Sequence, residues 1–398
     1  SPDTGAHKRR RTCFMRGLLR LAAALVLALS VVPAVQSFAA GLGDFGEMLE
    51  GQREAFDMDS VNDALSDDVK KALGKLGIDG ADDLDLSEKL SFKKVMGLVL
   101  SSFLDSVGRY GVLFVSIAGV ILLLSLFESL KSAYRNKSLD TAFTFIGGAA
   151  LCSLIYQPFY SAAAGIAGAI GGIGDFMKAL IPVFTALMAS SGSVSGAAVF
   201  SAMLFLAVQL AAAIAGGIML PLVNLYMAAG VAASVSGNVN LKHVTAFLRT
   251  VVLWGTGLLL TVFSGVLALQ SIVAGAADSV AKRSVKFAIG SLIPVAGSQL
   301  GDAVDAMFAS ARMLKSALGV FGIAAVFVTL LSPFLVCAAN YLIVKLGALL
   351  SAVSGNEQAT GVLEVMREGF GMVLGICAAL CVMFLFTLAL AVVSTGSA

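Results

Sequence analysis

Hydrophobic residues occur in long uninterrupted blocks along most of this chain, not at the spacing of a soluble amphipathic helix. Asp, Glu, Lys and Arg are absent from Ala179–Leu241, Thr250–Ala277 and Ser316–Val344. A helix that crosses a bilayer needs about 20 consecutive apolar residues, so blocks of this length predict transmembrane helices. Tyr110–Phe127 is the first clear span.

The composition supports this interpretation. Of 398 residues, 58% are hydrophobic and 13% are charged, whereas soluble domains have about 45–50% apolar and about 25% charged residues. A soluble core cannot enclose that excess of apolar side chains. The sequence therefore predicts an all-α, polytopic membrane protein, with a membrane domain over residues 109–398.

The first 39 residues have the order of a signal peptide. Arg16 and Arg20 precede the apolar run Leu21–Val32, and the small-residue stretch Ser37–Ala39 follows. Positive charge, a short apolar core and small residues form the pattern that a signal peptidase reads, and we expect cleavage at the end of that stretch. An uncleaved anchor helix is the alternative. Residues 1–14 precede this segment and are set aside.

Residues 40–108 form a second region, which we expect to be extracytoplasmic. Gly41–Leu90 contains fourteen acidic residues against five basic ones, a charge that disfavours binding to nucleic acid. Ser60 and Ser66 precede apolar residues at helical spacing, which predicts short amphipathic helices. The Asp and Gly residues of Asp79–Asp85 lack the spacing of a calcium loop. We interpret the carboxylates as a solvated or docking surface.

Basic residues indicate the orientation of the first span. Lys131, Arg135 and Lys137 follow Tyr110–Phe127, and cytoplasmic loops are enriched in such residues. A signal peptide would deliver the acidic segment to the outer side, so the first span would return the chain to the cytoplasm. The two signals agree.

Proline motifs recur at an offset of 112 residues. The sequence Leu-Ile-Pro-Val occurs at Pro182 and again at Pro294, and Pro221 is matched by Pro333. Transporters place interrupted segments of this kind at binding sites between paired repeats. The two units that we predict are residues 139–236 and 250–353.

The charge pattern favours an inverted relation between these units. The segment before Pro294 holds three cations, whereas the segment before Pro182 does not. These cations are Lys282, Arg283 and Lys286. The positive-inside rule places them in the cytoplasm. That arrangement requires the Pro182 and Pro294 segments to be re-entrant or interfacial, and it leaves Lys242 and Arg249 on the outer side.

Paired carboxylates are one candidate for chemistry. Asp302 and Asp305 lie three residues apart on a predicted amphipathic helix, and such pairs can carry out acid–base catalysis. The same helix carries two cations and no histidine lies nearby, which favours a solvated or ion-paired face. Asp278 and Lys282 have the i, i+4 spacing of a helical ion pair.

Lys345 is a second candidate because it stands between apolar residues. A cation inside a membrane helix is costly and tends to face a partner or a pore. The alternative is that its ammonium group extends to the membrane surface along its own aliphatic stem.

The sequence contains no motif for catalysis, a cofactor or a metal. Cys377 and Cys381 are four residues apart without an accompanying His or carboxylate, so we interpret them as packing residues. His7 and His243 are far apart and lack companions. Neither a dinucleotide-binding nor a phosphate-binding glycine loop is present. We therefore expect a protein that is not an enzyme and holds no cofactor.

One stretch carries a family resemblance. Ala277–Ala288, Ile293–Gly297 and Asp302–Asp305 resemble the central signature of the stage III sporulation protein AE family. The resemblance implies that these positions form a structural or channel-lining region. It also implies a subunit of the mother-cell membrane assembly that connects the mother cell to the engulfed forespore. Implied partners are the other membrane proteins of the same sporulation operon and a cytoplasmic secretion-type ATPase.

Two other functions fit the same sequence. The repeat and Lys345 suit a stand-alone secondary transporter, although acidic residues for ion coupling are scarce in the apolar blocks. A purely structural membrane scaffold is the third possibility. Purification with or without operon partners distinguishes these functions.

Overall fold

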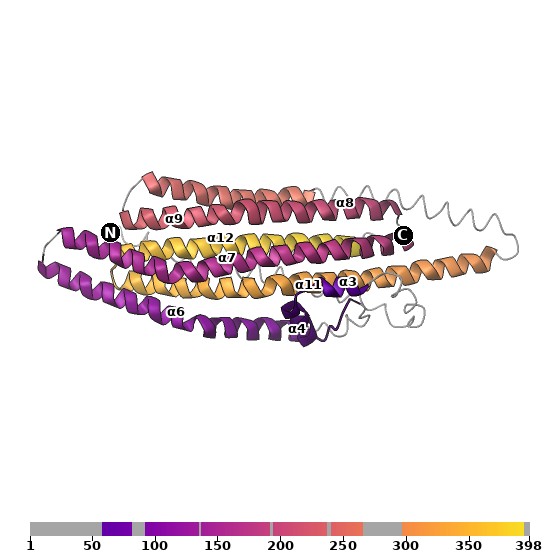
Figure 1. The fold of residues 1–398 in the computed structure, drawn as a ribbon, viewed down its shortest axis with the longest axis horizontal. Helices are drawn as coiled ribbons and strands as arrows, with labels where there is room; N and C mark the ends of the chain where they lie inside the picture. Colours follow the sequence, from indigo (N-terminus) through magenta and orange to yellow (C-terminus); the bar gives the residue numbers. More distant parts are fainter. Residues whose placement is uncertain are drawn as a thin grey trace, which may run out of the picture.

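The computed structural model describes residues 58–81, 92–134, 137–191, 194–236, 240–265 and 297–393. Within these ranges the chain is helical apart from short turns, and no strand occurs. The elements are α3 (Met58–Asp63), α4 (Asp67–Leu76), α6 (Phe92–Tyr134), α7 (Lys137–Ser190), α8 (Val194–Ala211), the π-helix η1 (Ala212–Met219), α9 (Leu220–Ser236), an unlabelled helix Asn240–Gly265, α11 (Gly297–Val353) and α12 (Glu357–Val393). They form one elongated bundle (Figure 1).

Six helical segments in the described part of the chain are long and apolar enough to cross a membrane. They are Lys93–Phe127, Phe145–Ser190, Leu204–Ser236, Asn240–Gly265, Ala311–Val353 and Glu357–Ala389. This confirms the predicted all-α, polytopic architecture. The first of them contains the predicted span Tyr110–Phe127 and begins well before it. At 1.5 Å per residue the 54 residues of α7 extend over about 80 Å, so the bundle is much longer than a bilayer core of about 30 Å.

The helices differ in how much of their surface is enclosed. In the most apolar stretch of each helix, 67% of α11 and 61% of α12 is buried inside the protein. The corresponding shares are 11% for α6 and 22% for Asn240–Gly265. The outer helices present large apolar side chains: Val112 on α6 is 74% exposed, and Trp254 on Asn240–Gly265 is 75% exposed. In a polytopic protein such a surface faces lipid. The bundle therefore has α11 and α12 at its centre and lipid-facing helices around them.

Glycines bring the helices into close contact. A Cβ atom at Gly148 of α7 would overlap Val235 of α9, and one at Gly347 of α11 would overlap Ile117 of α6. Small residues at helix crossings are the usual means of tight packing in membranes, where lipid gives helices no hydrophobic reason to associate. These contacts fix which residues of neighbouring helices lie at the same height along the bundle.

The order of contacts shows that successive spans alternate in direction. Gly148 and Gly174 of α7 face Val235 and Val208 respectively, so α7 and the α8–η1–α9 rod are antiparallel. The same reasoning applies to the other neighbouring pairs. For the α8–η1–α9 rod and Asn240–Gly265, the contacts are Gly230–Thr245 and Gly255–Met219. For α9 and α12 they are Gly230–Val365 and Gly369–Met227. For α11 and α12 they are Gly347–Leu363 and Gly371–Tyr341.

This alternation changes the topology expected from charge. Pro182 lies inside the continuous helix α7, between the fully buried Leu180 and Phe184, so α7 does not turn back at Pro182 as a re-entrant segment would. The start of Asn240–Gly265 then lies at the same end of the bundle as Lys137. Lys242 is therefore on the side of the basic loop, and the expectation that it lies on the opposite side is wrong. The reason is that α7 runs the whole way through the bundle, and the antiparallel α8–η1–α9 rod brings the chain back to the end where α7 began.

The α8–η1–α9 rod has an unusual backbone. The eight residues of η1 form a π-helix, and Pro221 follows directly in the first turn of α9. π-helical segments are rare and occur frequently at functional sites. The rod therefore changes its helical geometry just before the α9 residues that contact α12.

The acidic segment contributes two short helices that pack on the bundle. Val69, Leu73 and Leu76 of α4 are buried, whereas its acidic residues are exposed, as expected for an amphipathic helix. Gly77 ends α4 with φ of 84°, a left-handed conformation that glycine adopts without strain. The backbone N–H of Ala81 donates a 2.8 Å hydrogen bond to Oδ1 of Asn62, which links α3 to the segment that follows α4. The predicted signal peptide lies outside the described residues.

The proposed repeat stays a prediction. Pro221 and Pro333 lie within α9 and α11, but Pro294, the counterpart of Pro182, is outside the described residues. The structure therefore offers no comparison of the segment around Pro182 with the segment around Pro294.

Candidate functional site: a polar layer inside the bundle

Polar and charged side chains from four helices gather at one height of the bundle, where their helices are otherwise apolar. We call this set the polar layer. Its members are Asn224 and Tyr226 of α9, Arg249 of Asn240–Gly265, Asn340 and Lys345 of α11, and Arg367 and Glu368 of α12. Close contacts bracket it: Gly230 meets Val365 on one side of Glu368, and Gly369 meets Met227 on the other.

Glu368 is the centre of one half of the polar layer. The hydroxyl group of Tyr226 donates a 2.8 Å hydrogen bond to its Oε2 atom. Nε of Arg249 lies 3.5 Å from the same oxygen, and an Arg367 guanidinium nitrogen lies 3.8 Å from Oε1. The Glu368 side chain is 28% exposed, so its charge is partly desolvated. Three helices thus meet at one carboxylate.

Arg367 belongs to the other side of α12. It stands one turn from both Leu363 and Gly371, which face Gly347 and Tyr341 of α11. The next residue, Glu368, faces α9. Adjacent residues of opposite charge therefore leave α12 on different faces, because successive positions on a helix are about 100° apart, and the guanidinium group of Arg367 reaches back to within 3.8 Å of the Glu368 carboxylate.

The α11 side of the polar layer holds Asn340 and Lys345. Asn340 is 0% exposed, and Lys345 is 7% exposed. The ammonium group of Lys345 lies 5.7 Å from the centre of the Tyr341 ring, a cation–π geometry. Lys345 is thus enclosed by protein, on the face of α11 that meets α12.

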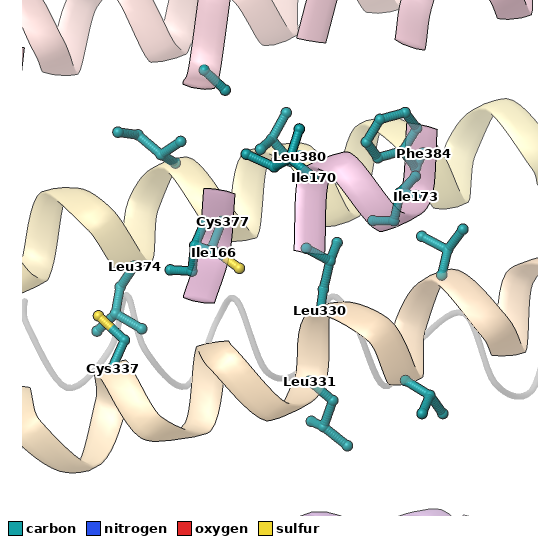
Figure 2. Close-up of a cluster of buried hydrophobic side chains, with 14 of the residues drawn as sticks. Ile166, Ile170, Ile173, Leu330, Leu331, Cys337, Leu374, Cys377, Leu380 and Phe384 are labelled. Carbon is teal, nitrogen blue, oxygen red and sulfur yellow. The ribbon is translucent and has the colours of Figure 1, made fainter. Parts of the chain in front are cut away.

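An apolar layer adjoins the polar layer toward the end of the bundle where α7 ends and α11 begins. Figure 2 shows Ile166, Ile170 and Ile173 of α7 packed with Leu330 of α11 and Leu374 of α12. Cys337 and Cys377 lie in the same cluster, and the thiol of Cys337 donates a weak 3.6 Å hydrogen bond to the carbonyl oxygen of Phe370. A tightly packed apolar layer therefore borders the polar layer on one side.

The arrangement can bind or transfer charge but has no sign of a metal centre. Among the residues that the structure describes, no group of three or more His, Cys, Asp or Glu could hold a metal ion. Glu368 offers a carboxylate, and the two arginines next to it offer cations. Ionisable residues inside membrane helices are costly, and by default they indicate a functional site.

Few of the residues singled out from the sequence lie in the polar layer. Lys345 does. Pro182 lies elsewhere, in α7, and Asp302 and Asp305 lie in the first turns of α11, where the structure describes the backbone but not these side chains. The other candidates lie outside the described residues. They are Asp278, Lys282, Arg283, Lys286 and Pro294.

Glu368 and Arg367 were not singled out from the sequence, and Arg249 was considered only as a cation left on the outer side of the membrane. One signal could have found the first two. They stand immediately before the charge-free run Gly369–Val393, in a helix long enough to span a membrane. Tyr226, Asn224 and Asn340 carry no comparable signal, because single polar residues are common in membrane helices.

Comparison with known proteins identifies the family. A model of the family described as stage III sporulation protein AE matches residues 82–395. The chain belongs to the stage III sporulation protein AE family. It is 27% identical over 283 residues to the stage III sporulation protein AE of Bacillus subtilis (strain 168), an alignment that covers 70% of each chain. No solved structure is significantly similar.

This family assignment gives the protein a role in sporulation and confirms the resemblance drawn from Ala277–Asp305. The matched region contains all six candidate spans and every residue of the polar layer. Residues 1–81, which include α3, α4 and most of the acidic segment, precede it.

Proposed function

We propose that the protein is a membrane subunit of the channel or export apparatus between mother cell and forespore, located in the mother-cell membrane around the forespore. The family supplies the sporulation role. The observation that supports transport is the polar layer, in which Glu368, Arg249 and Arg367 lie within the membrane-spanning bundle.

Partial burial of Glu368 and Arg367, whose side chains are 28% and 20% exposed, argues for a use beyond packing. Replacing buried ion pairs by apolar side chains is often neutral or stabilising, so stability alone gives no reason for charge at this height. A polar layer next to a tightly packed apolar layer is the arrangement expected where a pathway is closed at rest. Movement of α12 against α9 or α11 would alter both layers together.

The proposed partners follow from what this chain lacks. Its sequence has no phosphate-binding loop, so we assign energy input to a cytoplasmic secretion-type ATPase and assembly to the other membrane proteins of the operon. The chain itself acts without catalysis in this proposal. Lys242, an exposed cation next to the start of its helix, offers a contact for such partners on the cytoplasmic side in this proposal.

A stand-alone secondary transporter is the second candidate, and one observation favours it. Glu368 is a carboxylate shared by Tyr226 and Arg249 inside the bundle, and membrane carboxylates of this kind can couple to protons or cations. In this case the protein would function without operon partners.

Affinity purification from sporulating cells, combined with deletion of the gene, tests the proposal. We expect the tagged protein to co-purify with operon membrane proteins in mild detergent. We expect deletion to permit engulfment and vegetative growth but to abolish late forespore gene expression. A protein that purifies alone, and that still supports sporulation when the partner genes are deleted, would favour the transporter instead. Co-purification with normal late expression in the deletion strain would contradict both transport functions.

A further inference from the structure

Two enclosed polar atoms of α11 and α12 have no hydrogen-bond partner in the part of the chain that the structure describes. Asn340 is 0% exposed, and its Nδ2 atom donates a 2.9 Å hydrogen bond to the carbonyl oxygen of Val336. This bond fixes the orientation of the amide, since the reverse would place two oxygens together. Oδ1 of Asn340 is therefore a buried acceptor without a donor.

Arg367 presents the complementary problem. Its Nε atom is fully enclosed and reaches no acceptor among the described residues, and a carboxylate oxygen of Glu368 lies 3.8 Å from a different nitrogen of the same guanidinium group. Nε–H is a donor that cannot be deprotonated at any ordinary pH. An unsatisfied buried donor or acceptor of this kind costs about 1–3 kcal/mol.

Both atoms belong to the same stretch of the α11–α12 contact. Cys337 and Tyr341, on either side of Asn340, touch Phe370 and Gly371 of α12. Arg367 lies one turn before Gly371 on the same face. A missing acceptor for Arg367 and a missing donor for Asn340 thus occur within about one helical turn of each other along the bundle.

The chemistry of the two atoms selects the occupant. An anion would satisfy Arg367 but would be repelled by the amide oxygen of Asn340. A cation would suit the amide oxygen but would be repelled by Arg367 and by Lys345 nearby on α11. Water both donates and accepts, and buried waters in proteins typically make about three hydrogen bonds to such groups.

We propose that ordered water occupies the α11–α12 contact between Asn340 and Arg367, inside the membrane-spanning bundle. Oδ1 of Asn224, a third enclosed acceptor without a donor, lies at the same height on α9. It extends the hydrated region to the other side of α12. The inference rests on hydrogen bonding alone and is independent of the channel proposal.

Radiolytic hydroxyl-radical labelling of the purified full-length protein tests this site. X-rays generate radicals from bound water in place, so buried side chains next to ordered water are modified although bulk solvent does not reach them. Met366 and Met383 form a matched pair on α12, because each is 1% exposed and they have the same chemistry. Met366 adjoins Arg367, whereas Met383 lies in the apolar part of the helix.

We expect Met366 and Tyr341 to be modified at least fivefold faster than Met383. Asn340→Leu removes the acceptor and should lower labelling of Tyr341 severalfold, while Met383 and the elution volume in gel filtration stay unchanged. Equal rates for Met366 and Met383 in the native protein would overturn the proposal. So would undiminished labelling of Tyr341 in a folded Asn340→Leu variant.

Discussion

The Tyr226 hydroxyl group donates a 2.8 Å hydrogen bond to the Glu368 carboxylate, although the two residues are 142 positions apart in the sequence. The bond joins α9 to α12 at the height where Arg249 of a third helix also reaches the same carboxylate oxygen. It ties an outer helix to a central one through a charged group.

Removing that hydroxyl group should destabilise the bundle. Hydrogen bonds to charged groups contribute about 1.5–3 kcal/mol, so we expect Tyr226→Phe to lower the free energy of unfolding in detergent by that amount. Tyr160→Phe on α7 is the control, because this side chain is 53% exposed. Denaturation followed by circular dichroism measures both. Equal stability of the two variants would show that the bond contributes nothing.

Close glycine contacts give a second prediction. A Cβ atom at Gly369 would overlap Met227 of α9, whereas one at Gly375, also on α12, would meet open space. Gly369→Val should therefore displace the buried Met227 side chain and lower the melting temperature by several degrees, since overpacking costs about 1–3 kcal/mol. Gly375→Val should stay close to the native value. Thermal unfolding in detergent decides the matter, and a Gly369→Val variant as stable as Gly375→Val would refute the contact.

The alternating spans predict which residues are accessible from outside. With the basic loop near Lys137 in the cytoplasm, a cysteine in place of Lys242 should resist an impermeant thiol reagent in intact cells. A cysteine in place of Lys178, near the opposite end of α7 and 61% exposed, should react. Both variants are made in a cysteine-free background. Reaction at Lys242 without reaction at Lys178 would reverse the orientation.

The same assay addresses Lys282–Lys286, which lies outside the described residues and which we expect to face the cytoplasm. Protection of cysteines at these positions supports this expectation, and ready labelling contradicts it.

The fold class followed from the sequence because it depends on block length alone: an uncharged run such as Ser316–Val344 has no other stable environment. The direction of α7 did not follow. Pro182 suggested an interruption, but neighbouring helices can stabilise a proline inside a membrane helix, and Leu180 and Phe184 are buried on both sides of it.

The polar layer was harder to predict than the fold. Lys345 was visible as a lone cation in an apolar run, and its contact with Tyr341 has the i, i+4 spacing of neighbours on one helix. The contact of Glu368 with Tyr226, in contrast, joins residues 142 positions apart. The glycines that set the spacing of α9 and α12 have no partner that a single sequence identifies. Pairing between distant helices is a property of the packed bundle.

The most direct test of the account is the sporulation frequency of a Glu368→Gln strain beside a Glu364→Gln strain. Both changes remove one carboxylate from α12 one turn apart, but Glu364 is exposed and Glu368 holds Tyr226 and Arg249. With both proteins at the native level in the membrane, we predict at least a tenfold loss of heat-resistant spores for Glu368→Gln and none for Glu364→Gln. Native spore counts in both strains would contradict a role for the polar layer in sporulation.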